Sequence, residues 1–374
     1  MTSDNPTADY PLFEQFPSLS SKLPRVALGN FPTPVKEASE LASSLGIGRL
    51  FIKRDDLTHG LYGGNKVRKL ELILADAEIR GYKSVITYGG IGSNHFLATT
   101  VHASARGMKS IGVLVPQPVT ATVKKNLLLD LHFGAEIHLA QGYSDAAAEA
   151  LRQMLRHTIM DGRPPYNIPT GGSSISGVIG YINAAFELKK QIERGELPEP
   201  DMIFVAVGTC GTASGLIAGC HAAGLKTKVI GVKVTDWVAG NSILMASLAN
   251  QATLKLFSID RRFPLRFLAP FNIDLLTEYF GDEYGRLTHE GMEAVDTVKE
   301  FTGLKLEGVY TGKAFAGLIG ASKKQDLSNK TVLFWNTYNS ADLSSFASQH
   351  DYHELPKEFQ YFFEVPEHTV DDLH

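Results

Sequence analysis

The feature that most constrains the fold is an alternation of short apolar segments with amphipathic helical segments, separated by glycines. Between about residues 61 and 168 this pattern predicts strands at 84–88, 110–115 and 136–139 with helices between them. Strands that alternate with helices of this length indicate βαβ units, in which a parallel sheet carries helices on its faces. The sequence therefore predicts an α/β fold.

A second run of the same kind begins at about residue 177. Because a single core rarely grows beyond roughly 250–300 residues, a chain of 374 residues favours two domains. We expect a small open-sheet domain over residues 61–169 and a large domain from residues 1–60 and 170–374. Each would contain an open, twisted, mostly parallel sheet. The elements expected in the second run are a helix at 177–194, a strand at 202–207, a helix at 212–223, a strand at 229–234, an irregular middle, a helix at 288–301 and a strand at 332–335.

Composition excludes several classes of function. The net charge of −4 argues against a nucleic-acid or anionic-membrane surface, because such surfaces need a basic footprint. The two cysteines, Cys210 and Cys220, are too few for a disulfide framework, and no histidine cluster suggests a metal site. The polar residues 1–6 do not resemble a signal peptide, and no apolar run is long enough to cross a bilayer. We expect a cytoplasmic protein without a metal.

A lysine behind two glycines opens one of the predicted helices. Residues 63–71 read GGNKVRKLE, so Lys66 is held at the mouth of a helix. Burial, or positive charge from Arg68 and Lys69, would keep part of its amine unprotonated, and such an amine can form a Schiff base with an aldehyde cofactor. A surface helix with a basic first turn is the alternative interpretation.

A glycine-rich turn, GTCGTASG at residues 208–215, lies between a buried strand and a helix. Backbone N–H groups at such a turn, with the helix dipole behind them, form an anion-binding cradle. The turn lacks the lysine of a Walker loop and does not match GxGxxG. A tight turn without a ligand is the alternative, but pyridoxal phosphate (PLP) needs both an amine and a phosphate-binding turn. Cys210 is either a thiolate stabilised at a helix start or a small residue that fits.

The segment over residues 53–71 carries RDD, GGNK and RKLE in that order. It resembles the PLP enzymes of the tryptophan-synthase-β-like fold (fold type II), and within them the D-cysteine desulfhydrase and 1-aminocyclopropane-1-carboxylate (ACC) deaminase group. The resemblance implies that PLP lies between the two domains and that Lys66 holds it as a Schiff base. It also implies the residues that bind the phosphate, which are Gly208, Thr209, Cys210, Gly211 and Thr212.

The turn GGIGSNH at residues 89–95 resembles the family's GGIQSNH. By that resemblance Asn94 would hydrogen-bond the cofactor's ring hydroxyl, and Ser93 would face the substrate. Gly92 replaces the family's glutamine, which removes an amide from the substrate site. His95 is expected to be a packed or capping residue.

Residues 307–314, EGVYTGKA, resemble the family's PVYTGKA. The resemblance implies that Tyr310 stands over the reaction centre and that Thr311 lies near the pyridine nitrogen. Tyr284 matches a tyrosine that closes on the substrate. Each tyrosine could equally be a core residue whose hydroxyl is satisfied.

The motif NTYN at residues 336–339 stands where the family has HTGG. It keeps Thr337 as a second partner of the ring nitrogen, whereas Tyr338 and Asn339 replace two glycines. The segment TGGSS at residues 170–174 resembles a crossover between the domains that borders the active-site cleft.

The function implied is a PLP-dependent lyase that performs α,β-elimination on a small amino acid, most simply D-cysteine, and yields pyruvate, ammonia and sulfide. ACC deaminases carry a glutamate where this chain has Thr311, so the hydroxyl favours elimination over ring opening. Two alternatives stay open. One is ACC deaminase, with Ser93 and Tyr310 taking part in the reaction, and the other is a catalytically altered PLP-binding relative. A homodimer is expected from the resemblance.

Overall fold

The computed structural model describes residues 10–369, so the polar stretch at residues 1–6 lies outside the described part. The chain divides into two compact units. The large unit comprises Met1–Leu72 and Ser173–Ser340, and the small unit comprises Ile73–Gly172 and Ala341–His374. Helix α3 (Asn65–Ile79) runs from the first into the second. Within residues 10–369, no helix combines the length and the apolar composition needed to cross a membrane.

The large unit is built on a six-stranded sheet of order β1-β2-β10-β7-β8-β9. The pairs are parallel except that β1 runs antiparallel to β2. Side chains of successive strand residues point to opposite faces, so each strand contributes to two cores. The strands are β1 (Val35–Glu37), β2 (Ile47–Arg54), β7 (Met202–Val207), β8 (Lys228–Lys233), β9 (Asp274–Leu276) and β10 (Leu327–Asn336).

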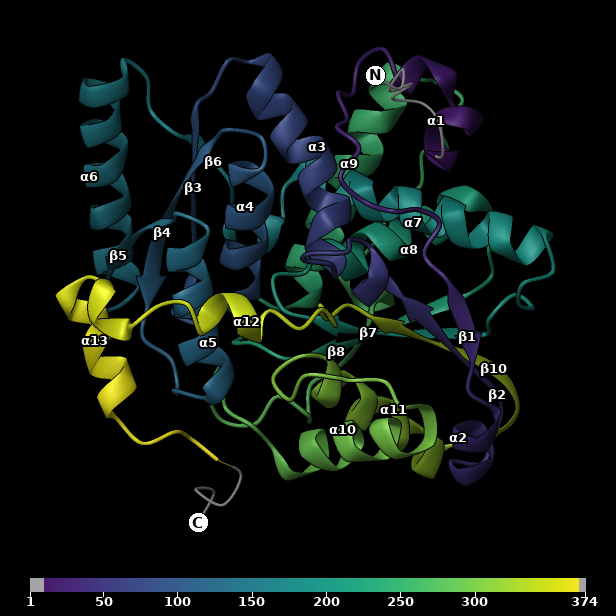
Figure 1. Ribbon diagram of the computed structural model, residues 1–374. Helices are drawn as coiled ribbons and strands as arrows, with labels where there is room; N and C mark the ends of the chain where they lie inside the picture. The colour runs from purple at the N-terminus through teal and green to yellow at the C-terminus, as the bar shows by residue number, and fades with distance from the viewer. Residues whose placement is uncertain (1–9, 370–374) are drawn as a thin grey trace. The chain divides into compact units, whose positions relative to one another are not determined.

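Helices cover both faces of this sheet (Figure 1). On one face, Phe51, Val205 and Trp335 pack against one group of helices. On the other face, Ile52, Phe204 and Phe334 pack against another. The first group is α1 (Pro11–Gln15), α7 (Ile175–Glu193), α8 (Gly211–Ala223) and α9 (Ser242–Ile259), and the second is α2 (Ser39–Ser44), α10 (His289–Thr302) and α11 (Thr311–Lys324). Short 3-10 turns occupy Pro17–Leu19, Asp55–Leu57 and Pro270–Asn272.

The small unit contains a four-stranded parallel sheet of order β5-β4-β3-β6. Phe96 and Leu127 from helices α4 and α5 pack on one face, and Ala150 from α6 packs on the other. Its elements are β3 (Ser84–Gly90), α4 (Asn94–Ser104), β4 (Lys109–Val115), α5 (Ala121–His132), β5 (Glu136–Leu139), α6 (Tyr143–Asp161), β6 (Tyr166–Asn167), a 3-10 turn at Thr170–Gly172, α12 (Ser344–Ala347), a 3-10 turn at Tyr352–Glu354 and α13 (Lys357–Glu364).

The C-terminal segment differs from the sequence-based expectation. The sequence placed all residues from 170 to 374 in the large domain, but Leu355, Phe359 and Phe362 are buried in the core of the small unit. The short elements of this segment carry large apolar side chains, and these side chains leave water by packing on one face of the small sheet. The prediction of an irregular middle in the second run was wrong, because residues 242–259 form helix α9.

Candidate active site

The predicted lysine stands at the start of helix α3, directly after the turn of Gly63 and Gly64. Gly64 has φ +93°, and a Cβ there would lie 2.9 Å from the carbonyl oxygen of Thr337. Only glycine satisfies both constraints, since other residues rarely adopt positive φ. The turn is held by Asn65 N–H, which donates to Thr337 O at 3.1 Å. Lys66 follows as the second residue of the helix, half-buried, and burial lowers its pKa to about 8.

A buried ionic network anchors this helix from the side of Arg68. The guanidinium donates to Asp55 at 2.7 and 2.9 Å and to both carboxylate oxygens of Glu187 at 2.9 Å. Lys53 adds a second cation, 2.6 Å from Glu187. The sequence suggested that Arg68 places positive charge beside Lys66. In the structure two carboxylates balance the two cations, so Arg68 adds no uncompensated charge there.

Lys69 is a second buried lysine, and it interacts electrostatically with Lys66. It lies three residues further on, and residues at this spacing share a helix face. Burial lowers the pKa of Lys69 well below its usual value, and the neighbouring Lys66 lowers it further. A Cβ added to Gly211 would lie 3.1 Å from the Lys69 nitrogen. The amine therefore faces the turn that precedes helix α8.

That turn is the predicted anion cradle, and it lies beside the lysine turn. The Asn65 amide donates to Thr212 Oγ1 at 3.1 Å, which joins the start of α3 to the start of α8. Ser173 closes the cradle, because its hydroxyl accepts from Gly211 N–H at 3.2 Å and is 2.8 Å from Thr209 Oγ1. The first N–H groups of a helix have no partner within the helix, so this end of α8 suits an anion.

Cys210 occupies an unusual backbone conformation at the helix N-cap. Its φ is +68°, the one positive φ of a non-glycine residue within residues 10–369. The thiol is buried and donates to the carbonyl oxygen of Ala239 at 3.3 Å. Burial raises its pKa to about 11. These contacts favour the interpretation of Cys210 as a small packed residue over that of a thiolate.

Tyr310 and Tyr284 form a pair against the cradle. Their hydroxyls are hydrogen-bonded to each other. A Cβ on Gly208 would lie 3.4 Å from the Tyr310 ring, so the ring contacts the first residue of the cradle. Burial raises the pKa of Tyr310 well above its usual value, and Tyr284 adds to that increase. The phenol therefore stays protonated over the whole range in which Lys66 titrates.

Glu307, which the sequence did not single out, positions the residues around Tyr310. Its buried carboxylate accepts from Val309 N–H at 2.7 Å and from Tyr310 N–H at 3.1 Å. Burial raises its pKa to about 7, although these two backbone donors and the nearby Lys313 oppose the increase. The Thr311 hydroxyl accepts from Glu307 N–H at 2.8 Å and lies 3.2 Å from Glu307 O.

Thr337 and its neighbours complete the part of the site carried by the large unit. Thr337 is buried at the end of β10, and its carbonyl oxygen holds the lysine turn as described above. Asn339, one of the two departures from the family pattern, accepts from Gly63 N–H at 2.8 Å through its side-chain oxygen. Tyr338 is half-buried, and burial raises its pKa, with Glu307 adding to the effect.

Ser93 and Asn94 belong to the small unit. The Ser93 hydroxyl caps α4 by accepting from Phe96 N–H at 3.2 Å, and Asn94 accepts from the Asn126 amide at 3.1 Å. His95 is buried, with its Nε2 3.1 Å from Thr87 Oγ1, which agrees with the predicted packing role.

Gly92 lies in a space that admits no side chain. A Cβ there would lie 2.6 Å from Val123 Cγ2, so the family's glutamine has no room at this position.

The structure thus brings together, within the large unit, Lys66, the cradle, Tyr284, Tyr310, Thr311 and Thr337. The sequence missed Glu307 and the contribution of Asn65. The sequence suggested Ser173 only as part of a crossover near the cleft, and the structure places it in the cradle. Within residues 10–369, no three metal-ligating side chains cluster.

Three comparisons bear on these features. A family model described as "Pyridoxal-phosphate dependent enzyme" matches residues 26–337. The chain is similar to a solved structure called an ACC deaminase homologue, with 30% identity and a TM-score of 0.73 over 89% of this chain and 98% of that chain. It shares a fold with the processed form of threonine deaminase isoform 2 from Solanum lycopersicum, at 18% identity and a TM-score of 0.57, over 91% of this chain and 92% of that chain. These likenesses confirm the predicted tryptophan-synthase-β-like α/β class.

Proposed function

This chain belongs to the family of pyridoxal-phosphate-dependent enzymes, and we propose that it is a lyase that eliminates a leaving group from Cβ of a small amino acid, with D-cysteine as substrate. With one water consumed, D-cysteine yields pyruvate, ammonia and hydrogen sulfide. The observation that carries the proposal is a lysine of pKa about 8 beside an anion cradle, combined with a hydroxyl, not a carboxylate, at Thr311.

The residues present fit PLP. Lys66 supplies the amine for covalent attachment, and the turn from Gly208 to Thr212 supplies backbone donors for the phosphate. Gly211 lets Ser173 and Lys69 approach the turn closely, because a Cβ there would lie 2.7 Å from Ser173 Oγ and 3.1 Å from the Lys69 nitrogen. Burial lowers the pKa of Lys69, and a dianionic phosphate beside it would raise that pKa again by favouring the protonated form.

Each residue of the large unit then has a defined task. When bound, PLP supplies the electron sink that stabilises negative charge at the substrate Cα. Because burial lowers the pKa of Lys66 to about 8, part of its amine is neutral near neutral pH, and a neutral amine can accept the Cα proton. The Tyr310 phenol is oriented by its hydrogen bond to Tyr284 and by the Glu307 carboxylate, which accepts from Tyr310 N–H. It can donate a hydrogen bond to the departing sulfur.

Thr311 supports elimination over ring opening. Its hydroxyl is buried and hydrogen-bonded to the backbone of Glu307, so position 311 itself carries a neutral group. The carboxylate of Glu307 is committed to the N–H groups of Val309 and Tyr310. In β-elimination the leaving group departs from the carbon next to the one that loses its proton, so a weaker electron sink would be sufficient.

ACC deamination is a second candidate, favoured by the similarity to the ACC deaminase homologue. ACC has no Cα proton, so Lys66 would have to act at a ring carbon. The hydrogen-bonded pair Tyr284 and Tyr310 could assist the opening of the ring.

The test is an assay of the purified holoenzyme with D-cysteine, L-cysteine and ACC, measuring sulfide, ammonia and 2-oxo acid identity. We expect D-cysteine to give sulfide and pyruvate in equal amounts, and Lys66→Ala to give neither. Formation of 2-oxobutanoate from ACC, without sulfide from D-cysteine, would replace the proposal by the second candidate. If borohydride fixed PLP to Lys66 but no amino acid were converted, the chain would be a catalytically altered relative.

A further inference from the structure

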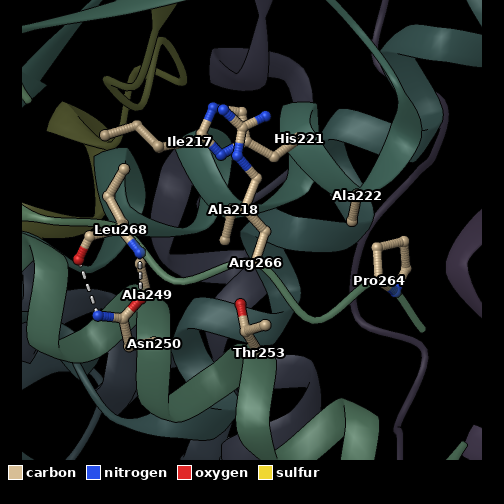
Figure 2. A pocket seen from close by; sticks show the side chains of 10 residues that line it. All are labelled: Ile217, Ala218, His221, Ala222, Ala249, Asn250, Thr253, Pro264, Arg266 and Leu268. Carbon is tan, nitrogen blue, oxygen red and sulfur yellow. Dashed lines mark hydrogen bonds between the residues drawn. The ribbon is translucent and has the colours of Figure 1, made fainter. Parts of the chain in front are cut away.

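A pocket of about 60 Å³ opens in the large unit at the end of helix α8 that is opposite the cradle (Figure 2). It lies between α8, α9 and the segment that follows α9. One water needs about 10–15 Å³ of such volume, so the pocket can hold a molecule of a few heavy atoms. The lining residues are Ile217, Ala218, His221, Ala222, Ala249, Asn250, Thr253, Pro264, Arg266 and Leu268.

Two basic side chains, His221 and Arg266, line this pocket without an acidic residue. Figure 2 shows the Arg266 guanidinium extending toward the His221 ring. Burial lowers the pKa of His221, and the positive charge of Arg266 lowers it further. Within residues 10–369, neither side chain has a hydrogen bond or an ion pair. A carboxylate between them would accept from the Arg266 guanidinium and from an N–H of the His221 ring, so it would satisfy donors on both side chains.

The remainder of the pocket is mostly aliphatic. Ile217 and Ala218 come from α8, and Leu268 comes from the segment after α9. This wall is held in place, because the Asn250 amide donates to Leu268 O at 2.9 Å and accepts from Leu268 N–H at 2.8 Å (Figure 2). The Asn250 side chain is thereby occupied. A purely inorganic anion would leave the apolar surface in contact with water, whereas an alkyl group would cover it.

We propose that this pocket is a second binding site, separate from the lysine and its cradle, for a small aliphatic monocarboxylate of about three to five carbons. The carboxylate lies between Arg266 and His221, and the alkyl chain contacts Ile217, Ala218 and Leu268. Recognition combines a charge-assisted hydrogen bond from the guanidinium with burial of the alkyl chain. The site does not depend on which reaction the enzyme performs.

The test is binding of butyrate to the PLP-loaded protein, measured by saturation-transfer NMR and titration calorimetry. Arg266→Gln is expected to weaken butyrate binding at least tenfold. Arg261→Gln is the matched control, because Arg261 is an exposed arginine of the same segment that stacks on Phe257 and does not line the pocket. It should leave binding unchanged. Ala222→Leu, which fills the pocket and keeps both basic groups, should also abolish binding.

The ligand class is tested with three further probes. Phosphate, butylamine and butanol should each bind at least tenfold more weakly than butyrate, since each lacks the carboxylate or the alkyl chain. The proposal is overturned if phosphate binds as tightly as butyrate, if Arg266→Gln binds butyrate like the unchanged protein, or if Arg261→Gln reduces binding to the same extent. Butyrate that bound only at the catalytic site would not respond to Arg266→Gln or Ala222→Leu.

Discussion

Replacing Asp55 by asparagine should destabilise the large unit far more than the loss of a surface ion pair would. Asp55 is completely buried, and its oxygens accept hydrogen bonds from Thr33 at 3.0 Å, Tyr181 at 2.6 Å and Trp335 at 2.7 Å. They also accept two from Arg68. Asparagine of the same shape would point an NH₂ donor at groups that are themselves donors, and it would leave one buried cation without its counter-ion.

The magnitude follows from the charges in the network. Arg68 and Lys53 are balanced by Asp55 and Glu187, with all four side chains at most 2% exposed. Removing one partner of a buried pair typically costs about 3–5 kcal/mol. The control is Glu37→Gln. Glu37 pairs with Arg49 at 2.7 Å, but these side chains are 37% and 48% exposed, so about 0–1 kcal/mol is expected.

The assay is urea unfolding of the three proteins, followed by circular dichroism, with the free energy of unfolding taken from the midpoint and slope. Circular dichroism is preferable to tryptophan fluorescence, because the Trp335 indole itself donates to Asp55. Asp55→Asn should shift the midpoint several times further than Glu37→Gln. If the two variants lost the same free energy, the network would not be what anchors helix α3, and the reasoning would fail.

Three further predictions concern the site and its support. Lys69→Met should weaken PLP binding about tenfold to a hundredfold in equilibrium dialysis, because a charged hydrogen bond contributes about 1.5–3 kcal/mol; exposed Lys36→Met should have no effect. Burial alone would raise the pKa of Glu187, but Arg68 and Lys53 outweigh burial and lower it to about 2. The stability from this pairing should therefore be complete above pH 4.5 and be lost as pH falls toward 2, and an acid titration of Glu187→Gln should show a flatter profile. Asn339→Gly should lower the unfolding free energy by about 1 kcal/mol and speed PLP release, since it removes the acceptor of Gly63 N–H.

The parts of the fold that the sequence predicted are those with local signals. The strands at 136–139 and 202–207 were predicted with their observed bounds. The first, EIHL, alternates polar and apolar residues, the second, MIFVAV, is an apolar run, and turns flank both. Helix α9 was missed because it is apolar on most sides, so no amphipathic period distinguishes it from a buried strand. Its N-cap was a usable signal, because Asn241 accepts from Leu244 N–H at 2.8 Å.

Helix α11 was missed for a different reason. It contains Gly312, Gly317 and Gly320, which disfavour a helix by roughly 1 kcal/mol each relative to alanine. The tertiary structure requires the small residue at Gly317, where a Cβ would lie 2.7 Å from Val232 on the underlying sheet. Close packing between helix and sheet therefore overrides local propensity, and a single sequence carries no sign of it.

The surroundings of Lys66 could also be predicted from the sequence only in part. Its place at a helix start and its shared face with Lys69 follow from spacing alone. The neutralisation of Arg68 does not, because Glu187 lies 119 residues away in the chain and meets it only in the folded core. The sequence could therefore identify the amine, whereas the origin of its lowered pKa, burial and not a free neighbouring cation, required the structure.

The replacement of two family glycines by Tyr338 and Asn339 was the strongest sequence argument for a catalytically altered relative. The structure gives one of these replacements a supporting role, because the Asn339 side chain accepts from Gly63 N–H and so adds a bond to the turn that presents Lys66. A decaying site would be expected to lose the contacts that hold its lysine. Here the lysine turn is held by Thr337, by Asn65 and additionally by Asn339. The Asn339 replacement therefore strengthens the turn that presents Lys66, which argues against reading it as a sign of decay.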